Sequence, residues 1–144
     1  MFGQLFDGTV LIIVTVAIHV LALSWGIKRL RLRQSIEAAS LLSVTLLLSR
    51  VAVLVILAHL IEIVLWSSYF WYRGVLPTFE ESFYFSAVTY ATIGYGDIVP
   101  PPDWRLIASM EGLTGILMCA WSGGFFFALV SRFYDPTNAH GNGR

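Results

Sequence analysis

The sequence predicts an all-α membrane protein with three transmembrane helices and a shorter apolar segment that enters the membrane without crossing it. The first observation is composition: 57% of the 144 residues are hydrophobic and 12% are charged, whereas a soluble domain carries about 25% charged residues. The second is that three apolar runs are long enough to cross a bilayer. The third is that a fourth apolar run, between the second and the third, is too short to do so.

The composition also excludes several classes of function. Lys and Arg together number 9, as do Asp and Glu, so the chain lacks the basic excess of a nucleic-acid binder and no nucleic-acid partner is expected. So few charges do not suit a soluble enzyme either, and we expect no catalytic activity. The single cysteine, Cys119, excludes an intrachain disulfide and a zinc site built on several thiolates. The length fits one domain.

The first predicted helix covers residues 9–27, where His19 is the one ionisable side chain. Nineteen helical residues span about 28 Å, which is close to the hydrocarbon thickness of a bilayer. The basic cluster at residues 28–33 follows the apolar run, which is the reverse of the order in a secretory signal peptide. By the positive-inside rule this cluster is cytoplasmic and the N-terminus lies outside. Residues 1–35 are therefore expected to form an N-terminal transmembrane helix and a basic loop.

The second and third predicted helices cover residues 38–66 and 104–130. Arg50 interrupts the second run near its cytoplasmic end, from which its long side chain can reach the interface. The aromatic residues that begin at Trp66 are typical of the outer interface. Residues 133–144 are polar and are expected to form a cytoplasmic tail.

The short apolar segment covers residues 79–91 and lies within the outer connection. Thr78 as N-cap and Glu81 three residues later form a capping box, which predicts that a helix begins here. Glycines at 94 and 96 and a run of three prolines at 100–102 predict that the chain then returns as irregular backbone. Irregular backbone at membrane depth is tolerated where protein surrounds it or where it lines a wet cavity, so this segment predicts a pore or a buried site.

The sequence Thr-Ile-Gly-Tyr-Gly-Asp at residues 92–97 resembles the selectivity-filter signature of potassium channels of the pore-loop superfamily. The likeness extends over residues 89–100, and the order of outer helix, re-entrant helix, filter and inner helix is also that of the family. It covers roughly residues 38–132. The resemblance implies a pore domain at 36–132, with outer helix 38–66, pore helix 79–91, filter 92–97 and inner helix 104–130.

The resemblance further implies that K⁺ is the transported ion and that backbone oxygens bind it. The implied ligands are the carbonyl groups of four successive residues and one hydroxyl: Thr92, Ile93, Gly94 and Tyr95, with the Thr92 hydroxyl. Gly94 and Gly96 can adopt the positive φ that turns successive carbonyls inward. The Tyr95 ring is expected to pack behind the filter, and Asp97 to attract cations at the outer mouth. No organic cofactor is expected.

One chain supplies one filter strand and cannot enclose an ion. We therefore expect a homotetramer in a lipid bilayer, with the filter on its fourfold axis. The C-terminal end of the pore helix, near Tyr90, is expected to direct its partial negative charge at the ion pathway.

Three residues of the inner helix are candidates for gating: Gly115, Glu111 and Phe127. The resemblance implies a hinge at Gly115, and the alternative is a helix contact. By helical spacing Ile116, Cys119, Gly123 and Phe127 share a face, and Phe127 forms either a hydrophobic constriction or a lipid contact.

Glu111 lies at the same depth as His59 and Glu62, so a buried cluster of Glu111 with the backing of the filter or with His59 would make conduction pH-dependent. The alternative to a functional role is a structural hydrogen bond for Glu111, and for Glu62 it is a position close to the outer interface. His19 and His59 have no spacing that supports haem ligation.

The preferred function is that of a potassium-selective channel subunit in a prokaryotic plasma membrane. A weakly selective monovalent cation channel is one alternative, and a non-conducting structural or redox membrane subunit is another. The sequence does not indicate which stimulus opens the pore.

Overall fold

The computed structural model describes residues 2–29 and 41–134, and these residues form the predicted all-α membrane fold. The elements are α1 (Phe2–Arg29), α2 (Leu41–Tyr72), α3 (Phe79–Tyr90), the 3₁₀ turn η1 (Pro102–Trp104) and α4 (Arg105–Tyr134). Within the described ranges, α1, α2 and α4 are long and apolar enough to cross a membrane. Most of the predicted basic loop and the predicted tail from residue 135 onward lie outside the described residues.

The spanning helices are longer than their predicted apolar runs. The helix α1 already begins at Phe2, and α2 continues through the aromatic residues after Trp66 to Tyr72. The 32 residues of α2 correspond to about 48 Å of helix, which exceeds the hydrocarbon thickness. The predicted aromatic belt is thus the last part of a continuous helix, because polar and aromatic residues at the interface can extend a helix beyond its apolar centre.

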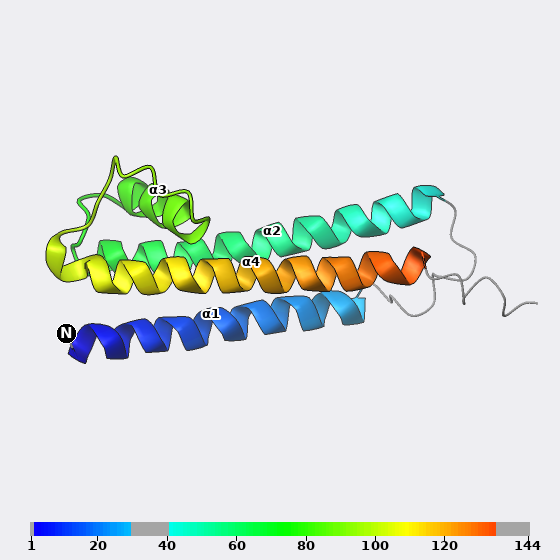
Figure 1. The fold of residues 1–144 in the computed structure, drawn as a ribbon, viewed down its shortest axis with the longest axis horizontal. Coiled ribbons are helices and arrows are strands. Elements are labelled where there is room, and N and C mark those ends of the chain that lie inside the picture. Colours follow the sequence, from blue (N-terminus) through cyan, green and yellow to red (C-terminus); the bar gives the residue numbers. More distant parts are fainter. Residues whose placement is uncertain (1, 30–40, 135–144) are drawn as a thin grey trace, which may run out of the picture.

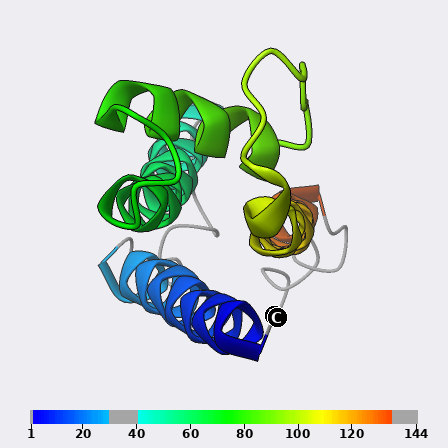
Figure 2. The ribbon, with the colours of Figure 1, turned by 90° about the vertical axis from the view of Figure 1, so that its left-hand side faces the viewer.

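The three spanning helices lie side by side, and the short helix covers one end of them. In Figure 1, α3 lies over the end of the bundle at which α1 and α4 begin. The view from that end in Figure 2 places α1 on one side of the α2 and α4 pair and α3 on the other. Because α1 contacts both α2 and α4, it forms part of the packed bundle.

An aromatic core holds α3 against α2. Trp66 and Phe70 of α2 are fully buried, and the rings of Phe70 and Phe85 meet edge to face with centroids 5.4 Å apart. Such pairs contribute about 0.5–1.5 kcal/mol beyond the burial of their area. The Trp66 indole also donates a hydrogen bond of 3.1 Å to the Thr15 hydroxyl, which ties α1 to the same core.

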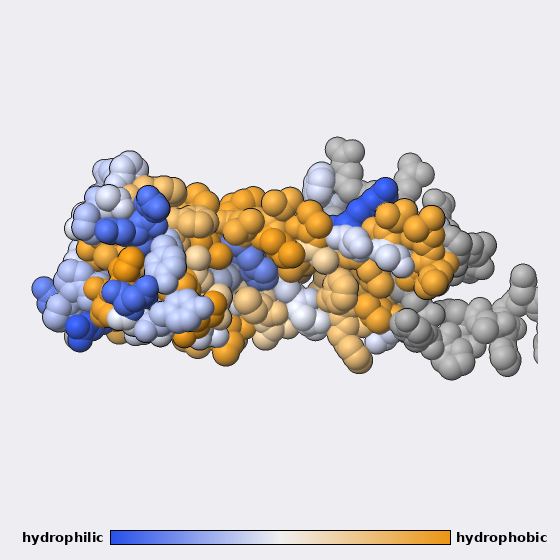
Figure 3. All heavy atoms as spheres, turned by 90° about the horizontal axis from the view of Figure 1, so that it is seen from above, coloured by the Kyte–Doolittle hydropathy of each residue, from blue (hydrophilic) through white to orange (hydrophobic). Residues whose placement is uncertain are grey.

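The outer surface is apolar over the middle of the bundle. Figure 3 shows hydrophobic residues along the central length and hydrophilic residues gathered over the end that carries α3. Large exposed apolar side chains occur along the helices, for example Ile13, Val53 and Leu117, which are 55–62% exposed. This distribution suits helices that face hydrocarbon.

Candidate functional site

The backbone after α3 is held by the end of that helix. The predicted N-cap is confirmed, since the Thr78 hydroxyl accepts a hydrogen bond of 3.1 Å from the Glu81 amide. At the other end Ala91 is the C-cap, and the amide of Thr92 donates to the Thr89 carbonyl (3.0 Å). The amide of residue 93 donates to the carbonyl of residue 88 (2.8 Å), which completes a Schellman motif.

This motif decides where the next carbonyl groups point. The amides of Thr92, Ile93 and Gly94 all donate to carbonyls of α3, the last of them to Val88 at 3.1 Å. In a planar trans peptide the N–H of one residue and the C=O of the residue before it point in opposite directions. The carbonyl groups of Thr92 and Ile93 therefore both point away from α3, whereas an ordinary strand would alternate them.

The same segment has an alternating backbone conformation. Thr92, Gly94 and Gly96 have φ values of 60°, 55° and 77°, and no other described residue between positions 75 and 134 has a positive φ. Gly94 and Gly96 adopt these values without steric cost, as the sequence analysis expected of them. Thr92 adopts the left-handed region despite its β-branched side chain, which is rare.

A side-chain hydrogen bond holds the far end of the segment to α3. The Tyr84 hydroxyl donates to Asp97 Oδ2 at 2.7 Å. This bond holds the pKa of the exposed Asp97 carboxyl group below its usual value, and it raises the pKa of the Tyr84 hydroxyl. Asp97 thus carries a negative charge at the mouth of the segment under ordinary conditions.

Two side chains of the segment are exposed within a single chain. Ile93 is 53% and Tyr95 is 69% exposed. The described residues of the same chain therefore do not cover the Tyr95 ring, which was expected to pack behind the segment.

Small residues of α4 accommodate the end of α3. An ideal Cβ at Gly115 would lie 2.1 Å from the Tyr90 carbonyl oxygen, and one at Gly112 would lie 3.6 Å from that of Thr89. Gly115 is thus required for close helix packing, which was one of its two interpretations. Its role as a hinge remains a prediction.

The predicted face of α4 is exposed in the single chain. Ile116 is 52% and Phe127 is 74% exposed, and Cys119 and Gly123 are exposed as well. Gly115 itself is buried against α3, so it does not belong to this face. The exposed residues are available to line a pathway or to contact another chain.

Glu111 of α4 is fully buried and interacts with the Ser86 side chain of α3. Under strict hydrogen-bond geometry, its carboxyl oxygens and the hydroxyls of Ser82 and Ser86 have no other partner among the described residues. The predicted cluster of Glu111 with His59 is not found, and Glu111 lies instead beside the helix that precedes residues 92–97.

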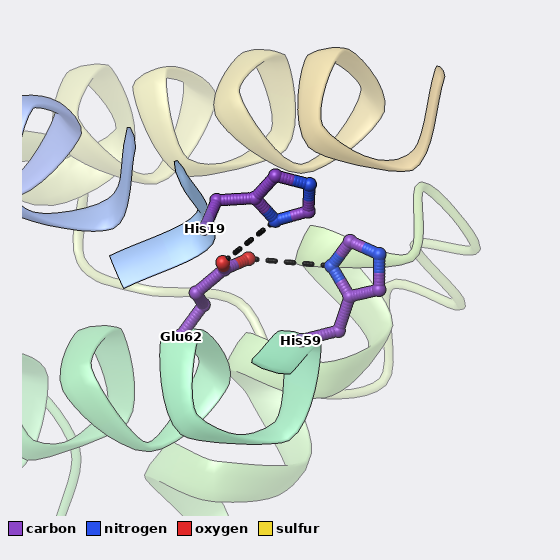
Figure 4. Close-up of side chains that lie close together, drawn as sticks. All are labelled: His19, His59 and Glu62. Atoms are coloured by element: carbon purple, nitrogen blue, oxygen red, sulfur yellow. Dashed lines mark hydrogen bonds and ion pairs between the residues drawn. The ribbon is translucent and has the colours of Figure 1, made fainter. Parts of the chain in front are cut away.

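A different buried cluster lies deeper in the bundle, and Figure 4 shows its centre. Glu62 accepts from His19 Nδ1 at 2.9 Å and from His59 Nδ1 at 3.2 Å. The Tyr90 hydroxyl donates to the same carboxylate, and Ser122 Oγ lies 3.1 Å from the Nε2 atom of each imidazole. We call these five residues the His–Glu cluster.

The His–Glu cluster corrects one expectation and adds a contact that the sequence did not predict. Glu62 is fully buried, so it does not owe its position to the outer interface. His19 and His59 lie together, with ring centroids 5.2 Å apart, although they come from different helices and no sequence spacing relates them. The ionisable side chains inside the apolar runs were the available indication that such a site exists.

Comparison with known proteins identifies a family. A family model described as "Ion channel" matches residues 51–132, which is more than half of the chain. No curated protein and no solved structure matches. The match covers most of α2, all of α3 and the segment after it, and most of α4, and it leaves out α1.

Proposed function

The chain belongs to this ion channel family, and from that premise we propose that it is a potassium-selective channel subunit. The proposed ligands are the backbone carbonyl oxygens of residues 92–95 and the Thr92 hydroxyl. Rows of carbonyl oxygens can replace the hydration shell that K⁺ loses when it enters the pore.

The observation that carries the proposal is the arrangement of amides after α3. Three successive amides are bonded to the end of that helix, so the carbonyl groups of Thr92 and Ile93 face the same way. Positive φ values at Thr92, Gly94 and Gly96 show that every second residue of the segment has the left-handed conformation. A segment of this kind offers a row of oxygens on one side, which is what a dehydrated cation needs.

We propose that four copies surround the ion. One segment offers oxygens from one side, and a cation in hydrocarbon needs ligands all around it. Closure by a fourfold axis would also cover the exposed side chains of Ile93 and Tyr95 and the exposed face of α4. Asp97 then contributes a ring of negative charge at the mouth.

The proposed orientation follows the charge distribution of the sequence. The basic cluster after α1 is cytoplasmic, so the N-terminus and the mouth at Asp97 are extracellular and α4 ends in the cytoplasm. A prokaryotic plasma membrane is the proposed location.

Reconstitution in liposomes tests the proposal. With K⁺ on one side and Na⁺ on the other, the reversal potential should lie near the potassium equilibrium potential. A reversal potential near zero would indicate a weakly selective cation channel. An absence of current in well-folded protein would indicate a non-conducting subunit, and both results reject potassium selectivity.

Glycine variants localise the effect. Gly94→Ala and Gly96→Ala should abolish selectivity, because a Cβ opposes the positive φ at each position. Gly74→Ala is the matched control, since Gly74 has a φ of 65° and open space around it but lies between α2 and α3. An equal loss of selectivity in all three variants would contradict the assignment.

A further inference from the structure

We propose that the His–Glu cluster is a binding site for a divalent transition metal of the zinc type, with Nδ1 of His19, Nδ1 of His59 and the Glu62 carboxylate as ligands. The proposal does not depend on potassium conduction. The three side chains come from α1 and α2, and their ligand atoms all lie within 4.8 Å of one another. Figure 4 shows both imidazoles turned toward the same carboxylate.

The ligand set determines the class of metal. Two imidazole nitrogens and one carboxylate form a usual set for Zn²⁺, whereas Mg²⁺ and Ca²⁺ prefer oxygen ligands throughout. Ligand atoms at about 2.1 Å from a tetrahedral Zn²⁺ lie roughly 3.4 Å from one another. The distances from the carboxylate oxygens to the two Nδ1 atoms are 2.9 and 3.2 Å, and all the ligand atoms lie within 4.8 Å of one another, so small side-chain movements bring them to one ion.

The charge of the cluster favours a bound cation. Ser122 Oγ lies 3.1 Å from each Nε2 and has a single hydroxyl proton, so pairing both nitrogens places a proton on at least one Nε2 atom. The Nδ1 atom of that ring is then an acceptor, and the Tyr90 hydroxyl lies 3.2 Å from His59 Nδ1. With both imidazoles neutral and Glu62 ionised, the cluster carries an uncompensated negative charge, which is costly in a buried site.

A metal ion on the Nδ1 side supplies the missing positive charge. Each imidazole then carries its proton on Nε2, and both N–H groups donate to Ser122 Oγ, which has two lone pairs. Histidines that bind metals usually donate their other N–H in this way, and ligating carboxylates are usually hydrogen-bonded in turn. The Tyr90 hydroxyl fulfils the second role, because it donates to Glu62 Oε2.

Among the described residues, the site is least enclosed beside His59. The side chains of His19 and Glu62 are fully buried, while that of His59 is 17% exposed. Trp121 of α4 packs beside His19 with ring centroids 5.9 Å apart. A metal ion therefore enters beside His59. Its binding joins α1 to α2, and the contacts of Tyr90 and Ser122 connect the site to α3 and α4.

Metal uptake by the full chain in lipid nanodiscs tests the proposal without any ion current. After treatment with a chelator, Zn²⁺ is titrated by calorimetry and the metal content is measured by mass spectrometry. We expect one Zn²⁺ per chain. Co²⁺ as a spectroscopic probe should give the intense visible bands of a tetrahedral site, without the thiolate charge-transfer band that a cysteine ligand would add.

Variants assign the ligands. His19→Gln and Glu62→Gln should each weaken Zn²⁺ binding by more than about 100-fold, and Ser122→Ala by about 10–100-fold. His140→Gln and Cys119→Ser should leave binding unchanged, because they remove other potential ligands. If a ligand variant does not fold, Ser122→Ala and the Co²⁺ spectrum of the wild-type protein still show whether the cluster binds a metal ion.

Three results would overturn the proposal. The first is that the wild-type protein does not bind one Zn²⁺ per chain. The second is uptake that Ser122→Ala and the ligand variants leave unchanged. The third is a cluster that responds to pH in the imidazole NMR resonances but binds no metal, which would show that a proton supplies the missing charge. Protein that binds Zn²⁺ without conducting K⁺ would reject the proposed function and leave this site intact.

Discussion

Thr92 is the residue at which the backbone is most strained. Its φ of 60° lies in the left-handed region, which costs an L-residue about 1–2 kcal/mol. The Schellman hydrogen bonds maintain this conformation. Glycine would occupy the position more cheaply, so the presence of threonine indicates that its side chain has a role, which fits the proposed hydroxyl ligand.

We expect Thr92→Gly to increase stability and to reduce potassium selectivity. Removal of the Cβ relieves about 1 kcal/mol of strain, while loss of the hydroxyl removes one proposed ligand. Thermal unfolding and reversal potentials measure the two effects. Thr92→Ser is the control, since it keeps the hydroxyl and should keep selectivity; a glycine variant as selective as the wild type would rule out the hydroxyl as a ligand.

The hydrogen bond between Tyr84 and Asp97 predicts a response to external pH. It lowers the pKa of Asp97, so the stability that it supplies is complete above the unfolded value of about 3.9 and is lost as pH falls through the lower folded value. In Tyr84→Phe the carboxyl group should become protonated at higher pH, nearer to 4. The midpoint of the acid-induced loss of potassium current should therefore move upward.

Tyr72→Phe serves as the control for this measurement. Tyr72 is 87% exposed at the end of α2, and its hydroxyl is not bonded to Asp97. The pH profile of this variant should match that of the wild type. Identical profiles for Tyr84→Phe and the wild type would show that the charge of Asp97 does not influence current.

Among the elements, the contact between α3 and α4 depends on Gly115. A Cβ there would meet the Tyr90 carbonyl oxygen at 2.1 Å, and backbone must move to relieve the clash. Gly115→Ala should therefore destabilise the protein by about 1–3 kcal/mol and displace the C-terminal end of α3. We expect lower unfolding temperature and reduced selectivity together.

Gly123→Ala is the matched variant on the same helix. Gly123 has no atom within 4 Å of an ideal Cβ, and alanine favours a helix more than glycine does. Its stability should be equal to or higher than that of the wild type. If the two variants lost the same stability, close packing at Gly115 would not be the cause.

The elements themselves could be predicted because they depend on local sequence. The apolar runs locate all three spanning helices, and the capping box at Thr78 locates the start of α3. The ends of the long helices were placed several residues short, as at Trp66, since a helix can continue through the interface after its apolar run has ended. The strained conformation of Thr92 was not predicted, because sequence preference argues against it.

For the molecule as a whole, the exposed face of α4 predicts reactivity at Cys119. This thiol is exposed in the single chain and shares its face with Ile116 and Phe127. If four copies turn this face toward the pathway, a cationic thiol reagent applied from the cytoplasmic side should reduce potassium current strongly. Cys119→Ser should be insensitive, and an open channel that leaves Cys119 unmodified would assign this face to lipid or to another helix.

The contacts between helices could not be predicted from the sequence. Depth along the helices placed Glu111 level with His59 and Glu62, but depth does not say how each helix is rotated about its axis. In the structure Glu62 faces His19 and His59, while Glu111 interacts with Ser86 of α3. The participation of His19 depends on packing between segments 43 residues apart, for which the sequence carries no local indication.

The bond between His19 and Glu62 has a consequence for biogenesis. Each of these polar side chains is costly when a helix enters lipid alone, and a charged group at the bilayer centre costs about 2.5–3.5 kcal/mol on insertion scales. The cost is recovered only when α1 and α2 dock. We therefore expect the two helices to leave the translocon as a hairpin, and a nascent chain arrested after α1 to be retained there or degraded.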